Sequence, residues 1–404
     1  INIPQNSTAA NYAGIVIAAS SSDPSSVGDA FSDGNIFDNN TIKGGYYGIA
    51  AMGGNNAFNA NNIFRNNTIQ DFYEYGIYIS RSQNNTIENN KINRSTRNSV
   101  GAFYGIYATG NSYGLKVSKN RIYDPFAANL PSTAAAHGIY IDANDASDLE
   151  PTIVSNNAIY NFNGGGTLYG VYNNSSDNVK LYHNTVAFND AAFAGSSSSY
   201  GFYQTSTAYA LEFTNNILHN TRGGAGSKFG IYLATANTEF ISNHNNVYVN
   251  GAAGNNNFGY AAANRPTLSA WQSFTTQDAN STALNPLFVN TVTGDLAPSE
   301  ILLDNTGTSV GVTTDINGVT RSLNTPDVGA FEITIQLCTE PAVAGSAIVN
   351  TTAGLCLGQK IILDLNGNST GGAQTYVWQK STTANGPWVD ISDSLYSPKF
   401  EYEL

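Results

Sequence analysis

Charged residues are scarce in this 404-residue chain, in which Asp, Glu, Lys and Arg together make up only 11% of the sequence. Those charges are also unbalanced, with 17 basic and 29 acidic residues and a formal net charge of -12. A strongly acidic chain is repelled by nucleic-acid backbones and anionic lipid surfaces, because both are negatively charged. We therefore expect no nucleic-acid partner and no binding to an anionic membrane surface.

Cysteine is nearly absent, and both copies lie late in the chain, at Cys338 and Cys356. Two cysteines in one small C-terminal segment are typical of a disulfide in an oxidising compartment. Together with a single Met and few Lys, this candidate disulfide predicts an extracellular protein at the cell surface. A free pair in a cytosolic protein is the alternative.

Long apolar runs are missing as well. No stretch approaches the roughly 20 apolar residues that a transmembrane helix needs, and none has the layout of a signal peptide. The chain begins with Ile1 rather than Met, so we expect a processed protein or a part of a longer polypeptide. No segment shows a sustained helical period either.

What the sequence does contain is a tripeptide, usually aromatic-Gly-apolar, that returns about every 30 residues. The copies are Ala13-Gly14-Ile15, Tyr47-Gly48-Ile49, Tyr75-Gly76-Ile77, Tyr104-Gly105-Ile106, His137-Gly138-Ile139, Tyr169-Gly170-Val171, Tyr200-Gly201-Phe202, Phe229-Gly230-Ile231 and Phe258-Gly259-Tyr260. A fixed period in this range indicates a solenoid or another repeat array.

A second column of residues, most often an Asn pair followed by an apolar residue, keeps the same period. Its copies include Asn39-Asn40-Thr41-Ile42, Asn66-Asn67-Thr68-Ile69, Asn89-Asn90-Lys91-Ile92, Lys119-Asn120-Arg121-Ile122, Asn156-Asn157-Ala158-Ile159, His183-Asn184-Thr185-Val186, Asn215-Asn216-Ile217-Leu218 and His244-Asn245-Asn246-Val247. Apolar and polar residues alternate before each pair, which is the period of a β-strand. Each repeat is therefore predicted to be several short strands joined by turns.

The Asn column has a physical explanation in a β-solenoid, where equivalent residues of successive coils stack about 4.8 Å apart. Asn tolerates the left-handed backbone conformation that tight turns need. Its amide can also donate to one identical neighbour and accept from another, which produces a ladder. The repeat thus predicts an all-β solenoid of about nine coils over residues 1–264.

Through these two columns, residues 14–262 resemble a right-handed parallel β-helix of the pectate-lyase-like superfamily. The resemblance is closest to the loose repeats of bacterial surface proteins. It implies the fold but no particular activity, because one fold hosts many functions.

The repeat stops near Arg265, and residues 265–335 are predicted to be a C-terminal cap of the β-helix. A short helix is expected from Pro266 to Phe274, with Thr267 as its N-cap and Trp271 on its apolar face. A solenoid end exposes unpaired strand edges that such a segment must cover. The order of motifs up to Asp327-Val328-Gly329-Ala330-Phe331-Glu332 resembles the closing segment of β-helices in exported proteins of Bacteroidetes-type bacteria.

Residues 336–404 resemble an immunoglobulin-like β-sandwich with Trp378 as the core tryptophan. The segment is shorter than such a sandwich usually is, so we expect it to be truncated. In proteins that it resembles, modules of this kind lead to a signal for the type IX secretion route. No such signal is present in this sequence.

Candidate catalytic residues are few. The Asp pair, Gly-His-Gly and Arg-x-Lys motifs that galacturonan hydrolases of this fold would need are missing from the sequence. Lyases need a basic residue beside Ca²⁺-binding carboxylates, and Lys and Arg form no cluster in the sequence. His137 lies in the tripeptide column, and His183 and His244 lie in the Asn column, so three of four histidines follow the repeat. We assign no catalytic residue, no metal ligand and no cofactor.

Two surfaces remain as candidates for binding. If the residue after each glycine points inward, the next residue points outward, and this outward column is Tyr78, Tyr107, Tyr140, Tyr172, Tyr203 and Tyr232. A tyrosine stripe can contact sugar rings or a protein partner, or its rings can simply stack on one another. The second candidate is the acidic group Asp142, Asp145, Asp148 and Glu150, which is either a Ca²⁺ or sugar-hydroxyl site or a solvated loop.

These observations favour a non-enzymatic structural or recognition module of a large secreted cell-surface protein, an adhesin or an appendage subunit. Its expected partner is a glycan or a protein on a cell surface, and a homo-oligomeric fibre is also compatible with the rod. The alternatives are a polysaccharide lyase or glycoside hydrolase with a site in the insertions at 124–137 and 142–151, and a carbohydrate-binding β-helix without cleavage.

Overall fold

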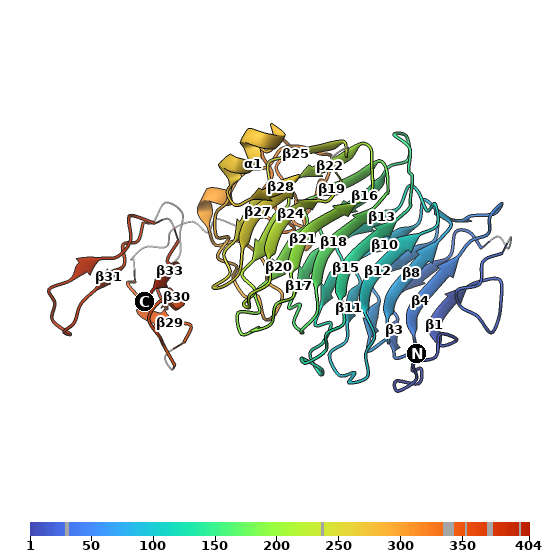
Figure 1. Ribbon diagram of the computed structural model, residues 1–404, viewed down its shortest axis with the longest axis horizontal. Coiled ribbons are helices and arrows are strands. Elements are labelled where there is room, and N and C mark those ends of the chain that lie inside the picture. The colour runs from blue at the N-terminus through green and yellow to red at the C-terminus, as the bar shows by residue number, and fades with distance from the viewer. Residues whose placement is uncertain (29–31, 236–237, 334–342, 352–353, 370–374, 396) are drawn as a thin grey trace.

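The computed structural model describes residues 1–28, 32–235, 238–333, 343–351, 354–369, 375–395 and 397–404. Its main body is a parallel β-solenoid whose coils follow one another from the N-terminal end to α1 (Figure 1). Every coil contributes one strand to each of three parallel sheets. The described residues form eight complete coils, and a ninth parallel strand follows in the first sheet.

Sheet 1 has ten strands, of which the last is antiparallel. In spatial order they are β1 (Ala13–Ile17), β4 (Tyr47–Met52), β8 (Tyr75–Ser80), β12 (Phe103–Thr109), β15 (Ala136–Asp142), β18 (Leu168–Asn174), β21 (Ser199–Thr205), β24 (Lys228–Leu233), β27 (Asn256–Ala261) and β28 (Ala263–Arg265).

Sheets 2 and 3 have eight strands each and meet at the Asn turns. Sheet 2 consists of β2 (Ile36–Asp38), β6 (Ile63–Arg65), β10 (Thr86–Glu88), β13 (Lys116–Ser118), β16 (Thr152–Ser155), β19 (Val179–Tyr182), β22 (Leu211–Thr214) and β25 (Phe240–Asn243). Sheet 3 consists of β3 (Thr41–Lys43), β7 (Thr68–Gln70), β11 (Lys91–Asn93), β14 (Arg121–Tyr123), β17 (Ala158–Tyr160), β20 (Thr185–Phe188), β23 (Ile217–Asn220) and β26 (Asn246–Val249). A further pair is formed by β5 (Asn59–Ala60) and β9 (Ser82–Gln83).

The Asn pairs have the two roles that the sequence predicts for them. The first residue of each pair adopts the left-handed conformation, as in Asn89 with a φ of 52°. The second residue is buried and joins a ladder: the Asn90 amide donates to Asn120 Oδ1 over 2.9 Å, and the Asn120 amide donates to Asn157 Oδ1 over 3.0 Å. The ladder satisfies polar groups inside the turn, which would otherwise be costly to bury.

The glycine of the tripeptide is required because its missing side chain would point into the core. A Cβ on Gly76 would lie 2.5 Å from the carbonyl oxygen of Gly105 and 2.6 Å from Cγ2 of Ile92. The same clash recurs in the neighbouring coils, as at Gly105 and Gly138. Glycine therefore recurs once in every coil, because the coils approach so closely at this position that no larger residue fits.

The sequence prediction is wrong for the last tripeptide, which does not align with the others in the sheet. Phe258-Gly259-Tyr260 is shifted by one position, because Asn257 pairs with Phe229 and Gly259 pairs with Ile231. Phe258 points into the core, and the ring of Trp271 fills the space over Gly259. Spacing alone could not reveal the shift, since it arises where the solenoid ends.

Helix α1 (Leu268–Thr275) closes that end and confirms the predicted helix. The side chain of Thr267 caps it by accepting a hydrogen bond from the Ala270 amide, and Trp271 is fully buried. Asp278 then ends the Asn ladder, because its Oδ1 accepts from the Asn245 amide over 3.1 Å while its Oδ2 accepts from Trp271 Nε1 over 2.8 Å.

Residues 284–333, which we call the strap, run back along the outer face of sheet 3. The strap contains one short 3-10 helix, η1 (Ile301–Leu303). It extends from Leu284, which accepts from Asn246 of β26, to Asn317, which accepts from Arg121 of β14. The segment expected to be an end cap thus has two parts, of which only the first covers the end.

The outward residues of sheet 3 are mostly apolar under the strap and polar beyond it. Phe288, Leu296, Leu303, Ile316, Val328, Ala330 and Phe331 of the strap form a second core with Ala158, Tyr160, Ala187 and Ile217 of sheet 3. In coils that the strap does not reach, the same outward columns hold Thr68, Gln70 and Lys91. The residue types on the outer face of sheet 3 therefore match their surroundings: they pack against the strap in the covered half and face solvent in the other half.

The C-terminal region is a small antiparallel sheet region that is consistent with an immunoglobulin-like module. The strands β29 (Ser346–Val349), β30 (Lys360–Asn366) and β33 (Phe400–Glu403) form one sheet, and β31 (Gln379–Lys380) pairs with β32 (Val389–Asp390). Trp378 is half-buried, and its Nε1 donates to the Pro398 carbonyl over 2.9 Å. Cys338 lies outside the described residues and Cys356 is exposed, so their disulfide stays a prediction.

Candidate functional site: a tyrosine face on sheet 1

Two parallel columns of aromatic side chains cover the outer face of sheet 1. The outer column is Tyr78, Tyr107, Tyr140, Tyr172, Tyr203, Tyr232 and Tyr260, each in register with the next. The inner column is Tyr47, Tyr75, Tyr104, His137, Tyr169, Tyr200 and Phe229. We call the two columns together the tyrosine face.

The sequence predicted six residues of the outer column but missed Tyr260 and the whole inner column. Strict alternation would place Tyr75 and Tyr78 on opposite faces of the sheet. They share a face, with ring centroids 5.0 Å apart, because Gly76 and Ile77 both point inward. The glycine between Tyr75 and Ile77 was the available signal, since glycine in a strand often marks a local break in alternation.

The rings of the tyrosine face stack along the solenoid axis. Centroids of neighbouring outer rings lie 5.1 Å apart for Tyr78 and Tyr107, and 4.4 Å apart for Tyr140 and Tyr172. The stack breaks after Tyr172, because the Tyr203 ring is turned 87° from it, and Tyr203 is nearly parallel to Tyr232 again at 6°. The outer column is thus interrupted there and also between Tyr107 and Tyr140, whose rings are tilted by 56°, whereas the inner column stays stacked through Tyr200 and Phe229.

The outer rings are half-buried and remain in contact with solvent, whereas Tyr47, His137 and Phe229 of the inner column are buried. Burial raises the pKa of Tyr232 to about 12, and the pKa of Tyr140 and Tyr172 is also raised by burial. The hydroxyls are consequently neutral at physiological pH and can both donate and accept hydrogen bonds. Such a surface can recognise sugar hydroxyls or polar groups of a protein.

Asp142 is the acidic residue that contributes to this face. It accepts hydrogen bonds from Tyr107 over 2.8 Å, from Thr109 over 3.2 Å and from Asn174 over 2.7 Å. The carboxylate is therefore fixed by three neutral donors beside the outer column.

The other predicted acidic residues do not join Asp142. Asp145 and Asp148 are exposed, and Glu150 accepts from Asn84 over 3.0 Å on the opposite side of the insertion. Within the described ranges, no group of three or more His, Cys, Asp or Glu side chains is arranged to hold a metal ion.

The four histidines have structural contacts. His137 is stacked between Tyr104 and Tyr169, with centroid distances of 4.6 and 4.7 Å, and burial lowers its pKa to about 3. Burial also lowers the pKa of His219 to about 4. Nδ1 of His183 contacts the Asp327 carbonyl over 3.0 Å, and Nδ1 of His244 contacts the Thr306 carbonyl over 2.8 Å.

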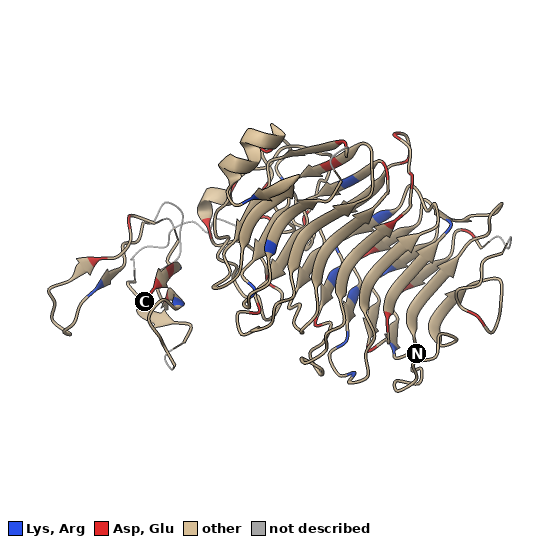
Figure 2. Cartoon of the chain, viewed as in Figure 1, with Lys and Arg blue, Asp and Glu red and all other residues tan. Residues whose placement is uncertain are grey.

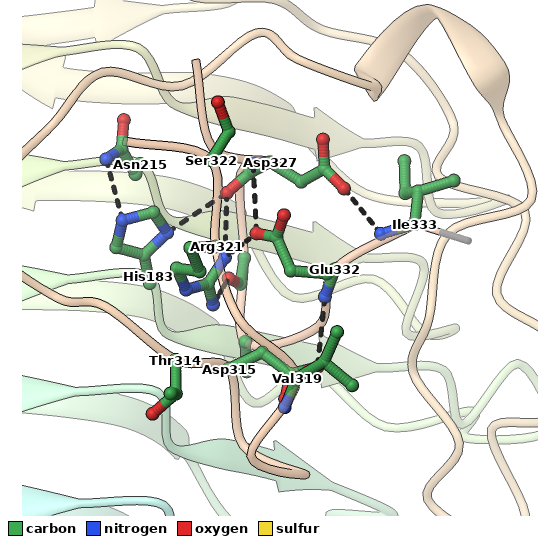
Figure 3. Close-up of polar contacts among 12 residues, drawn as sticks. His183, Asn215, Thr314, Asp315, Val319, Arg321, Ser322, Asp327, Glu332 and Ile333 are labelled. Atoms are coloured by element: carbon green, nitrogen blue, oxygen red, sulfur yellow. Dashed lines mark hydrogen bonds and ion pairs between the residues drawn. The ribbon is translucent and has the colours of Figure 1, made fainter. Parts of the chain in front are cut away.

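His183 belongs to a charged cluster that locks the strap to the solenoid (Figure 3). Arg321, which is 2% exposed, pairs with Glu332 and donates to the Asp327 carbonyl over 3.1 Å and to Asn156 Oδ1 over 2.7 Å. In sequence, Asp315-Ile316-Asn317-Gly318 resembles half of a calcium-binding loop but suits a plain turn better. The turn is observed, because Oδ1 of Asp315 accepts from the Asn317 and Val319 amides over 2.8 Å each. The cluster holds catalytic residue types, but His183, Arg321 and Asp327 are buried between the strap and the solenoid.

A cavity of about 750 Å³ lies elsewhere, between the solenoid and the C-terminal region. Glu401 of β33 connects the two walls, since it pairs with Lys360 over 3.1 Å and accepts from Asn285 over 3.0 Å. Lys399 adds a bond to the Phe288 carbonyl over 3.0 Å. The polar groups of this joint are largely used in holding its two walls together, so we give the tyrosine face precedence as the candidate site.

Comparison with known proteins agrees with this architecture. Residues 2–186 match the family model described as a right handed beta helix region. With three parallel sheets and a continuous Asn ladder, the solenoid has the parallel β-helix fold. No curated protein and no solved structure gave a significant match. No helix in the described part of the chain is long and apolar enough to cross a bilayer.

Proposed function

We propose that this chain is a non-enzymatic recognition module of a secreted cell-surface protein, and that the tyrosine face is its binding surface. The proposal depends mainly on the continuous outer column from Tyr78 to Tyr260, which is partly exposed in every coil. An array of neutral hydroxyls on a rigid sheet is suited to a glycan or to an extended protein segment. The β-helix supplies the rigid support.

The stacking of the rings defines how this surface would bind. Because most neighbouring rings lie face to face, their faces are shared, and the hydroxyls and ring edges are what the column offers to a ligand. The stacking itself contributes about 0.2–1 kcal/mol per pair to stability. A test of binding must therefore remove hydroxyls without removing rings.

The triple variant Tyr172→Phe, Tyr203→Phe, Tyr232→Phe meets this requirement. Each lost hydrogen bond is worth about 0.5–1.5 kcal/mol, so we expect at least a tenfold loss of affinity for a glycan or protein ligand found by screening surface polysaccharides and host proteins. Tyr209→Phe is the control, because Tyr209 is 52% exposed outside the face. Unchanged binding by the triple variant would contradict the proposal.

The enzymatic alternative is tested with the same proteins. The lowered pKa values of His137 and His219 argue against either side chain as a proton carrier at neutral pH. We expect no reducing ends and no unsaturated products when the protein is incubated with acidic and neutral polysaccharides. Products that disappear in an Asp142→Asn variant would refute the non-enzymatic assignment.

An extracellular location and lateral association into a fibre belong to the same proposal. Low charge, an Asn ladder and a rigid rod suit a protein that works outside the cell. Sedimentation of the chain at increasing concentration tests the fibre, for which a single monomeric species throughout would be the contrary result.

A further inference from the structure

A groove of about 490 Å³ lies at the corner between sheets 2 and 3, where the tip of the strap meets the Asn turns. Its walls include Asn66 and Asn89 from the turns, Lys119 and Arg121 from coil 4, and Asn317 from the strap. The tyrosine face is on sheet 1, so this groove is a separate surface and does not depend on the function proposed above.

Basic residues are few and are spread along the chain (Figure 2), and three of them, Arg65, Lys119 and Arg121, line this groove. Three other lysines have carboxylate partners, as in the pair between Lys180 and Glu212 over 3.0 Å. By contrast, Lys119 and Arg121 have no carboxylate within 4.0 Å among the described residues. Lys91 also lacks one, and it stands directly beside Arg121 in the register of sheet 3.

Neighbouring like charges in a register are destabilising unless something compensates them. Lys91 and Arg121 occupy adjacent coils, about 4.8 Å apart along the axis. Among the described residues, no carboxylate lies within 4.0 Å of Lys91 or Arg121 to compensate them. An anionic ligand would provide the missing compensation.

The strap holds the two groove cations in place without neutralising them. Lys119 Nζ donates to Thr314 Oγ1 over 2.8 Å, and Nη2 of Arg121 donates to Asn317 Oδ1 over 2.7 Å. Lys has three donors and Arg has five, so most of their hydrogen-bonding capacity is left for a ligand. Both side chains are half-buried, which fixes their direction.

The other charges at the groove are the ion pair of Arg65 with Asp38 and the carboxylate of Glu88, which together carry one net negative charge. Arg65 is bound to Asp38 over 3.0 Å, and Glu88 lies beside Arg65 in the register of sheet 2. A ligand would therefore meet the two positive charges of Lys119 and Arg121 and the single carboxylate of Glu88. The side chains of Asn66 and Asn89 form a neutral wall, in which Asn89 donates to Asn66 over 2.7 Å.

We propose that this groove binds an acidic glycan through its carboxylate or sulfate groups. Arg121 and Lys119 bind the acidic group, because charge-assisted hydrogen bonds to oxyanions are the strongest available to them. The Asn wall and the strap tip contact the sugar hydroxyls. A nucleic acid is disfavoured by the net charge of -12, whereas a short acidic segment of a glycan meets only the basic corner.

The experiment measures fluorescence anisotropy of the full chain with labelled uronic acid, sulfated and neutral oligosaccharides at low ionic strength. We expect binding of the acidic probes only, weakened at least tenfold in Lys119→Gln/Arg121→Gln and reduced by added salt. Lys180→Gln is the control, because it removes one positive charge outside the groove. Glu88→Gln should strengthen binding severalfold, since it removes the groove's carboxylate.

Several outcomes would overturn the proposal. These are equal binding of the neutral probe, an equal loss in Lys180→Gln, or unchanged binding in the double variant. Displacement of the acidic probe by millimolar inorganic sulfate or phosphate would show that the groove binds a free anion rather than a glycan. The charge-conserving variant Lys119→Arg/Arg121→Lys guards against misfolding, because it should retain most of the affinity if charge is what binds.

Discussion

Asn157 provides the most direct test of what holds the coils together. Its side chain is fully buried and makes four hydrogen bonds within the ladder. Oδ1 accepts from the backbone and side-chain amides of Asn120, each over 3.0 Å, while Nδ2 donates to the Val117 carbonyl and to Asn184 Oδ1, each over 2.9 Å. Replacing Asn157 by Ala removes all four bonds and leaves their partners buried.

The cost follows from these contacts. A net hydrogen bond contributes about 1 kcal/mol, and a buried partner left unpaired costs about 1–3 kcal/mol. We expect Asn157→Ala to lower the free energy of unfolding by about 4 kcal/mol. Asn157→Leu should cost a similar amount although it leaves no cavity, because the loss comes from hydrogen bonds rather than from packing.

Guanidinium unfolding followed by circular dichroism measures the loss, and hydrogen exchange at the Asn120 amide locates it. Asn98→Ala is the matched control, because Asn98 is exposed and no ladder bond involves its side chain; its effect should stay within about 0.5 kcal/mol. A loss below about 1 kcal/mol for Asn157→Ala, or full retention of stability in Asn157→Leu, would refute the reasoning.

Three further predictions concern the glycine column and two buried ionisable groups. Gly105→Ala places a Cβ 2.6 Å from the Gly138 carbonyl oxygen, so its thermal unfolding midpoint should fall by several degrees, corresponding to about 1–3 kcal/mol; an unchanged midpoint would count against the close-approach argument. Burial raises the pKa of Asp327 from 3.8 to about 6, so the folded state binds more protons than the unfolded state between these values. The free energy of unfolding therefore falls as pH rises through this window, by at most roughly 3 kcal/mol. Asp327→Asn should flatten that fall in denaturant titrations, and an identical slope would contradict the argument. Burial lowers the pKa of His137 from 6.5 to about 3, so the unfolded state binds more protons between these values and the free energy of unfolding rises with pH. His137→Phe should therefore be more stable than the natural chain at pH 4. Lower stability of the variant there would show that the fold needs the imidazole.

The solenoid was predictable because its rules are local and repeat. The left-handed Asn, the buried ladder amide and the inward glycine each follow from one residue type at one position, so copies such as Asn89-Asn90 and Gly105 report the same geometry many times. The helix near Trp271 was predictable for the same reason, because its cap and its apolar residue are local signals.

The strap was not predictable, because its partners are distant in the sequence and occur once. Asn156 and Arg321 lie far apart along the chain and meet only because the strap turns back along sheet 3. Without a period there is no second copy to confirm a pattern. The outward residues of sheet 3 change from polar to apolar along the sequence, from Lys91 to Ala158 and Ile217. This change can be explained only once the strap is known to cover the apolar residues.

The division between inward and outward columns also explains where function can reside in this protein. Inward positions such as Ile77 and Gly76 must satisfy the stacking of coils, so they are restricted to a few residue types. Outward positions on a face that no other segment covers carry no such restriction, yet sheet 1 has tyrosine in seven successive coils of its outer column. Threonine or lysine would keep the fold there, as Thr68 and Lys91 do in sheet 3. Ring stacking adds some stability to the column, and the proposed binding function is our explanation for its unbroken length.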